Sequence, residues 1–239
     1  MLRLIRYIKP YLAQVLLTIA LLFVQANADL ALPDYLSRIV NNGIQQGGVE
    51  NAVPLAIRQS QLEKVLIFVS AEEQALITGS YTLVDQNSPD YGQSVEQYPL
   101  LADEPVYVRM ELDQDQIDFL NPIMGRALLV VSTLEGAMAD PEKAAAFSQD
   151  SPFDLSQLPP GMDLFTLLRQ LPPAQLTSMT QTINEKFSTL GDSMTEQMAV
   201  AAVKAEYEAL GMDLSKLQSD YILRTGGMML LISLLGGAC

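Results

Sequence analysis

The chain of 239 residues contains no histidine, and its single cysteine is Cys239. Histidine is the commonest general base and metal ligand, so its absence excludes every catalytic triad that relies on imidazole. One cysteine excludes an internal disulfide and a thiolate metal cluster in this chain. The nearest approach to a Gly-x4-Gly-Lys-Ser/Thr motif, Gly43 to Gly48, is followed by Val49. The chain therefore has no P-loop with which to hold ATP.

Formal charge is missing from one stretch near each end. A run of 19 uncharged residues separates Lys9 from Asp29, and 15 more run from Thr225 to Cys239. A membrane helix needs about 20 apolar residues to cross about 30 Å of hydrocarbon. The first stretch is just long enough, whereas the second reaches only about 22 Å at about 1.5 Å per residue. We interpret the second as the start of a transmembrane helix whose remainder is missing.

The acidic residues are confined to the region between these stretches. All 28 Asp and Glu residues lie from Asp29 to Asp220, where ten basic residues leave a net charge of −18. Arg3, Arg6 and Lys9 precede the first apolar stretch, and basic residues beside a spanning helix mark the cytoplasmic side. We therefore predict a cytoplasmic N-terminus and an extracellular acidic region. Such a surface repels phosphate, which excludes nucleic acid as a partner.

The N-terminus also fits a secretory signal peptide, which is the alternative interpretation. Residues Tyr11–Val24 would be its apolar region, and Ala26-Asn27-Ala28 a small-x-small cleavage site. The product would be an exported or membrane-tethered acidic binding domain. Polar Gln14 and Thr18 interrupt this apolar region, and a cleaved product would leave the apolar run Met228–Leu235 unexplained.

Four segments resemble the start of an ABC exporter subunit. Residues Ala28–Pro33 and Ser37–Ile44 resemble the first transmembrane helix of that family. The segment Arg3–Tyr11 resembles the cytoplasmic elbow helix before it, and Tyr221–Leu230 is similar to the start of the second transmembrane helix. The resemblance covers about 44 residues at the front and 27 at the back. It depends on these segments occurring together, in this order and orientation.

The resemblance implies a transporter driven by ATP and magnesium on a nucleotide-binding domain that this chain lacks. It further implies a lipid bilayer around the helices, a second half-subunit forming a heterodimer, and an unidentified small-molecule, lipid or peptide substrate. Two departures matter. Roughly 170 residues separate the first two helices, as in some bacterial heterodimer-forming members, and four further helices are absent. We expect no ATPase activity from this chain alone.

The expected fold is mainly α, in a multi-pass protein of the cell membrane. Two transmembrane helices, the second truncated, flank a mostly helical extracellular insertion with at most a small β element. The expected parts are a cytoplasmic elbow helix (1–10), the first transmembrane helix with its outer extension (11–44), the acidic insertion (45–212), and a helix leading into the second transmembrane helix (213–239).

Periodicity and capping signals predict the elements of the insertion. Glycines at 43, 47 and 48 should break the first helix. We then expect a helix over 51–69, a loop over 85–99, a strand over 106–112, a helix capped by Asp113, a helix over 176–190 ended by Gly191, a helix capped by Ser193 with Glu196, and a last helix capped by Asp213.

Two groups of acidic residues are compared with cation sites. Asp113, Asp115 and Asp118 are typical of a helix's first turn, where free N–H groups favour negative charge. Asp85, Asn87 and Glu96 match positions 1, 3 and 12 of an EF-hand loop, but Pro89 and Asp90 stand at positions 5 and 6, so the template fails. We assign no catalytic, cofactor or metal residue.

Asp29 is the remaining candidate. An acid at the end of a spanning segment could line a translocation path, or it could mark the outer boundary of the membrane; both interpretations stand. The spacing of Met179, Met194 and Met198 predicts packing in a helical core instead of an adaptable binding surface.

Overall fold

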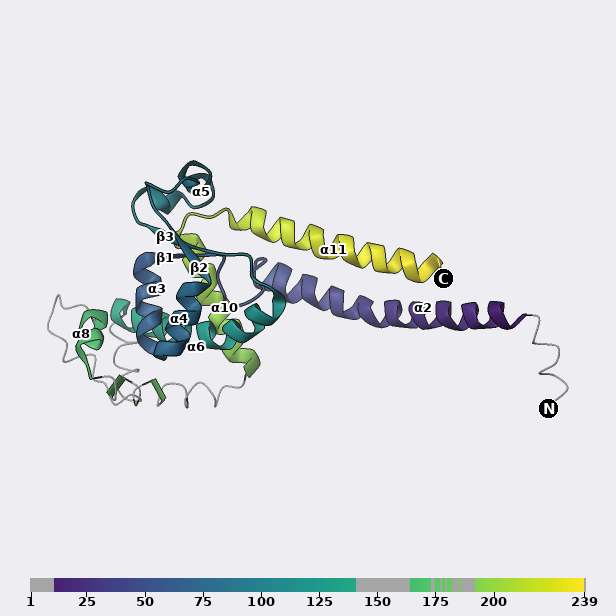
Figure 1. Ribbon diagram of the computed structural model, residues 1–239, viewed down its shortest axis with the longest axis horizontal. Helices are drawn as coiled ribbons and strands as arrows, with labels where there is room; N and C mark the ends of the chain where they lie inside the picture. The colour runs from purple at the N-terminus through teal and green to yellow at the C-terminus, as the bar shows by residue number, and fades with distance from the viewer. Residues whose placement is uncertain are drawn as a thin grey trace. The chain divides into compact units, whose positions relative to one another are not determined.

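The computed structural model describes residues 11–140, 164–172 and 192–238, together with residues 175, 176, 178, 180, 181 and 185 (Figure 1). The chain divides into two compact units. One contains both ends, Met1–Gly48 and Ser215–Cys239, and the other is Val49–Leu214. Helices dominate the described residues, so the prediction of a mainly helical fold with a small β element is confirmed. Residues 1–10, with Arg3, Arg6 and Lys9, lie outside the described part.

The unit with both ends consists of long helices. Helix α2 (Leu12–Arg38) continues into the π-helix η2 (Ile39–Gln45), and α11 (Leu214–Ala238) follows directly after Asp213. The first helix ends where Gly47 and Gly48 have φ values of 67° and 86°. That left-handed conformation favours glycine, so the predicted break holds at these two positions, whereas Gly43 lies inside η2.

Three helices of the described residues are long and apolar enough to cross a membrane: Leu12–Gln45, Gln114–Ala139 and Leu214–Ala238. The most apolar window of the first and of the last is only 6% buried, whereas that of the middle one is 56% buried. The middle helix is therefore a core helix of the second unit, and the other two leave their apolar side chains uncovered.

The second unit contains a three-stranded antiparallel sheet in the order β1-β3-β2. Its strands are β1 (Ala56–Arg58), β2 (Tyr81–Val84) and β3 (Val106–Arg109). Tyr107 of the central strand is opposite Ile57 on one side and Leu83 on the other. The predicted strand at 106–112 is β3, but it ends at Arg109.

The helix expected over 51–69 is wrong in its first half. Residues before Ala56 are irregular, β1 follows, and only then come α3 (Gln59–Val65) and the 3-10 helix η3 (Leu66–Phe68). The physical reason is pairing with β3, which satisfies this segment's backbone groups; the Arg109 amide also donates to the Leu55 carbonyl at 2.9 Å. Such long-range pairing overrides a short apolar period.

The loop expected over 85–99 is wrong in its second half. Asp85 accepts the Asn87 amide at 2.9 Å in a turn, and helix α5 (Tyr91–Gln97) then forms before the 3-10 helix η4 (Pro99–Ala102). Before them, α4 (Ala71–Gly79) begins at Ser70, which forms a capping box with Glu73. Polar loop composition therefore does not exclude a two-turn helix, and this one contacts η4, which follows it directly.

The long helix α6 (Gln114–Ala139) begins at the predicted cap. Asp113 accepts the Gln116 amide at 2.8 Å, and the Gln116 side chain accepts the Asp113 amide at 3.0 Å. Helix α10 (Asp192–Ala209) already includes Ser193, so the predicted cap there is wrong. Gly211, with a φ of 74°, follows that helix as predicted.

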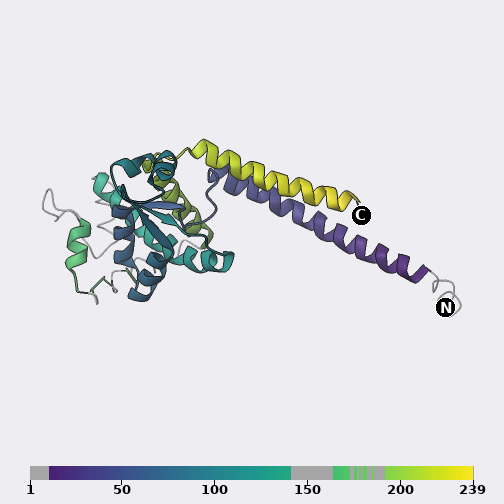
Figure 2. The same ribbon diagram turned by 45° about the horizontal axis from the view of Figure 1, so that its top comes forward.

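The described part of the core lies where helices meet the sheet. Helices α3, α4 and α10 contact the strands, and α6 packs along α10 and α3 (Figures 1 and 2). The short helix α8 (Leu164–Gln170) buries Leu164, Phe165 and Leu168. The largest fully buried side chains are Phe165, Ile57, Leu62, Ile77, Leu101, Met124, Leu128, Leu129, Leu134, Leu164, Leu168 and Leu210.

The predicted core role of the methionines is wrong for two of them. Met194 and Met198 are 54% and 40% exposed, because α10 turns Val200, Val203 and Tyr207 inward instead. Met179, Gly191 and much of the predicted helix over 176–190 lie outside the described residues; the described positions from 175 to 185 are helical.

Asp113→Ala should lower the free energy of unfolding by about 1 kcal/mol, because the Gln116 amide loses its cap. Urea unfolding followed by circular dichroism measures this change. Asp118→Ala is the control; its side chain only accepts a surface bond from Gln114 at 2.8 Å, so its loss should stay within about 0.5 kcal/mol. Equal losses in both variants would contradict a capping role.

Candidate functional site

Helices α2 and α11 run antiparallel and touch at both ends of their overlap (Figure 1). A β-carbon on Gly43 would lie 2.8 Å from Ile222 Cγ1, and one on Gly236 would lie 3.3 Å from Ala28 Cβ. The absence of a side chain on each glycine therefore leaves room for a side chain of the opposite helix at both points. The two points are 15 residues apart along α2 and η2 and 14 apart along α11, so they agree in register to within one residue.

A polar contact fixes this register near the π-helix. The Gln218 side-chain amide donates to the Gly43 carbonyl at 2.9 Å. A β-carbon on Gly48 would lie 2.9 Å from the Leu217 carbonyl oxygen, so the chain turns directly beside the start of α11. These contacts tie the two helices together where both carry polar residues.

Asp29 lies on the side of α2 that faces α11. Its Oδ1 would be 3.9 Å from a β-carbon on Gly236. The helix continues well past it, so Asp29 lies in the middle of Leu12–Gln45 and not at its end. Further along the same helix, exposed Asp34 and Arg38 form an ion pair at 3.1 Å.

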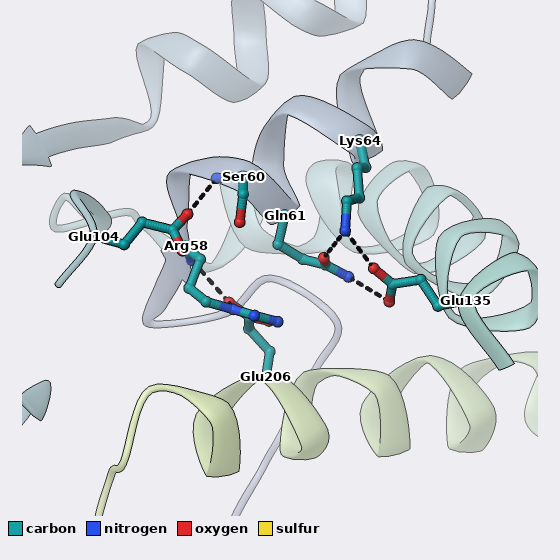
Figure 3. Close-up of polar contacts among 7 residues, drawn as sticks. All are labelled: Arg58, Ser60, Gln61, Lys64, Glu104, Glu135 and Glu206. Atoms are coloured by element: carbon teal, nitrogen blue, oxygen red, sulfur yellow. Dashed lines mark hydrogen bonds and ion pairs between the residues drawn. The ribbon is translucent and has the colours of Figure 1, made fainter. Parts of the chain in front are cut away.

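The second unit contains a buried ion pair that joins β1 to α10. The Arg58 guanidinium binds Glu206 through Nε, at 3.0 and 3.1 Å from its two oxygens, and through Nη2, at 2.7 Å (Figure 3). The Arg58 backbone amide donates to the same carboxylate at 2.8 Å. The Glu206 side chain is only 3% exposed. Hydrogen bonding to Glu206 raises the pKa of Arg58, against the opposing effect of burial.

A second polar group lies along α3 and α6 (Figure 3). The Lys64 ammonium donates to Glu135 at 2.7 Å, and the Gln61 amide donates to the other Glu135 oxygen at 3.1 Å. Lys64 also lies 5.0 Å from the centre of the Phe165 ring, a cation–π distance. The Ser60 amide at the start of α3 donates to Glu104 at 2.7 Å.

These polar contacts hold elements together instead of preparing a reaction. Each carboxylate in Figure 3 already accepts a hydrogen bond, and the cations that face Glu206 and Glu135 are bound to them. A general base or nucleophile needs an uncommitted group within reach of a substrate. No group of three or more potential metal ligands occurs among the described residues.

Three further polar groups hold residues 53–55 beside the sheet. The Tyr207 hydroxyl accepts the Leu55 amide at 2.7 Å, the Tyr81 hydroxyl donates to the Pro54 carbonyl at 2.9 Å, and Arg109 donates to the Val53 carbonyl at 2.7 Å. Burial raises the pKa of Tyr81 and, likewise, that of Tyr207 well above the ordinary tyrosine value.

The acidic groups compared with cation sites have other partners. Asp113 is the cap of α6. Asp85 accepts the Asn87 amide and the Ser88 hydroxyl, and these bonds lower its pKa. Both carboxylates therefore serve local backbone structure.

The periodicity of apolar residues does not predict the ion pairs of Arg58 with Glu206 and of Lys64 with Glu135, because the partners are up to 148 residues apart in the sequence. A sequence signal would have to come from covariation between such positions. Comparison of the chain with family models, with curated proteins and with solved structures found no match.

Proposed function

We propose that this chain is the N-terminal membrane portion of an ATP-driven ABC-type exporter subunit. In this proposal α2 and α11 cross the cell membrane and contribute to the translocation path, and Val49–Leu214 lies outside the cell. The observation that carries it is the antiparallel pair of uncovered apolar helices. The competing function is an exported or membrane-tethered acidic binding domain.

Two polar side chains in the apolar part of α2 bond to carbonyls of their own helix. The Thr18 hydroxyl donates to the Gln14 carbonyl at 2.9 Å, and the Asn27 amide donates to the Phe23 carbonyl at 2.7 Å. Hydrocarbon offers no alternative partner, so internal bonding of this kind is what a spanning helix requires.

The register of the pair supports a path-lining position for Asp29. Thr225, where the apolar part of α11 begins, pairs with about Val40 of α2, whereas the uncharged part of α2 ends at Ala28. A membrane fitted to α2 alone would leave most apolar residues of α11 in water, at about 1.5–3 kcal/mol for each large side chain. Burying Asp29 costs about 2.5–3.5 kcal/mol. An intermediate membrane depth divides these two costs, because it covers more of α11 and buries Asp29. At that depth Asp29 lies inside the outer leaflet, facing Gly236.

The same pairing favours the exporter over a cleaved signal peptide. Cleavage after Ala28 would remove the residue that Gly236 contacts and leave α11 without most of its partner helix. The candidate cleavage site, residues 26–28, lies within α2, which continues to Arg38.

A disulfide tests the helix pair in membranes. With Cys239 replaced by serine, Ala28→Cys with Gly236→Cys should form a disulfide, because the two β-carbons lie close to the usual 3.5–4.5 Å. After proteolysis of the connecting domain, the two helix fragments should stay joined without reductant. Ala28→Cys with Gly226→Cys is the control, since nothing lies within 4 Å of a β-carbon there. Equal yields from the two pairs would contradict the pairing.

Two further observations separate the exporter from the tethered domain. A mature protein that keeps Met1 supports the exporter, and one that begins at Asp29 supports the tethered domain. The DNA after the Cys239 codon decides the family: four hydrophobic segments and a P-loop support it, and their absence from the whole operon would overturn it.

A further inference from the structure

The Val49–Leu214 unit contains a cavity of about 490 Å³. It lies where the η3–α4 junction meets α6 and the described residues between 175 and 185. Its apolar wall includes Phe68, Val69, Ile123, Ala127 and Leu176. The volume falls in the range of about 300–1,000 Å³ that holds small ligands.

The polar groups of this wall are mostly committed to the protein's own backbone. The Gln74 amide donates to the Leu66 carbonyl at 2.9 Å, and the Thr180 hydroxyl donates to the Leu176 carbonyl at 2.9 Å. Glu73 accepts the Ser70 amide at 2.8 Å as part of the cap of α4. The cavity therefore presents an apolar interior with few free donors.

Arg126 is the one cation among the described residues that line the cavity. Its Nε donates to the Pro122 carbonyl at 3.1 Å within α6, and its two terminal nitrogens have no carboxylate partner among the described residues. By contrast, Arg58, Lys64 and Arg169 all pair with glutamates. An exposed arginine with no acidic partner among the described residues, in a unit whose residues sum to a charge of −17, provides an anion-binding group at the cavity.

We propose that this cavity binds a single-chain amphiphile with a carboxylate head, such as a medium-chain fatty acid. The alkyl chain lies against Phe68, Ile123 and Ala127, and the carboxylate binds the Arg126 guanidinium in the bidentate manner that arginine favours. The negative charge of the unit would draw in a cationic amphiphile instead, so discrimination by head-group charge depends on Arg126. The proposal does not depend on the exporter assignment.

The absence of tryptophan from the chain permits a clean binding assay. Ile67→Trp places one reporter at the cavity wall, and Tyr91→Trp places one in α5, which does not line it. The whole chain, reconstituted in lipid nanodiscs, is titrated with 10-bromodecanoate, whose bromine quenches a nearby indole. A bromoalkyl trimethylammonium of equal chain length is the charge control.

We expect saturable quenching of the reporter at 67 and only weak, linear quenching of the reporter at 91. In the Ile67→Trp background, Arg126→Gln should weaken bromodecanoate binding at least tenfold. Arg126→Lys should stay within about threefold, and Lys204→Gln, which removes a cation that does not line the cavity, should have no effect. Equal quenching of both reporters, equal binding of the cationic probe, or unchanged affinity in Arg126→Gln would each overturn the proposal.

Discussion

Glu206→Ala should destabilise the Val49–Leu214 unit by about 3–5 kcal/mol. The substitution leaves the Arg58 guanidinium without its carboxylate at a side chain that is only 27% exposed, and it also orphans the Arg58 amide. An unpaired buried charge retains its desolvation cost without the compensating attraction. Chemical unfolding of the membrane-reconstituted chain, followed by circular dichroism, measures the loss.

Two variants separate the ion pair from general damage. The double variant Arg58→Met with Glu206→Leu removes both charges and should recover much of the loss, because apolar replacements of similar volume are often neutral. Arg169→Ala breaks a pair with Glu63 whose side chains are 48% and 43% exposed, so it should cost no more than about 1 kcal/mol. A double variant as unstable as Glu206→Ala would refute the explanation.

Raising the pH above about 10 should progressively destabilise the same unit. The pKa of both Tyr81 and Tyr207 is raised in the folded state by burial, whereas in the unfolded chain each tyrosine titrates near pH 10. The contribution of these tyrosines to the free energy of unfolding is therefore fully present below about pH 10. It decreases as the pH rises further, because the unfolded chain loses its tyrosine protons at a lower pH than the folded chain does. Each tyrosine should contribute about 1.4 kcal/mol per pH unit to that loss.

Absorbance near 295 nm reports tyrosinate, and the lack of tryptophan leaves that signal clean. Tyr81→Phe should reduce the alkaline slope of the unfolding free energy by about a third, because burial also raises the pKa of Tyr98 and Tyr207, which keep contributing. Tyr107→Phe, at a half-exposed tyrosine of β3, is the matched control for the loss of one tyrosine hydroxyl. A wild-type stability that is flat from pH 9 to 11.5 would contradict the burial argument.

Local signals predicted the elements whose ends are set by neighbouring residues. Asp113 caps α6 because Gln116 is three residues away, and Gly211 follows α10 because its backbone is left-handed. The apolar character of α2 and α11 is equally local. In each case the determining residues lie within one or two turns of the feature.

The features that local signals did not predict depend on contacts between residues far apart in the sequence. Strand β1 exists because Ala56 and Arg58 meet Val108 and Val106, about 50 residues away. The inward face of α10 is set by the same packing, which left Met194 and Met198 outside. The carboxylate of Glu206 is recognisable as structural only when Arg58 is beside it. A single sequence holds no record of such pairs.

If the proposed function is right, the length of the first helix has a consequence for the bilayer around it. Leu12–Gln45 spans about 50 Å at about 1.5 Å per residue, against about 30 Å of hydrocarbon. Tilts of membrane helices reach about 40°, which is not enough to absorb that mismatch. Part of the apolar surface near Leu36, Val40 and Ile44, which is exposed in this chain, must then meet something other than acyl chains. Neighbouring helices are the natural cover, so the pair is poorly suited to exist alone in a membrane.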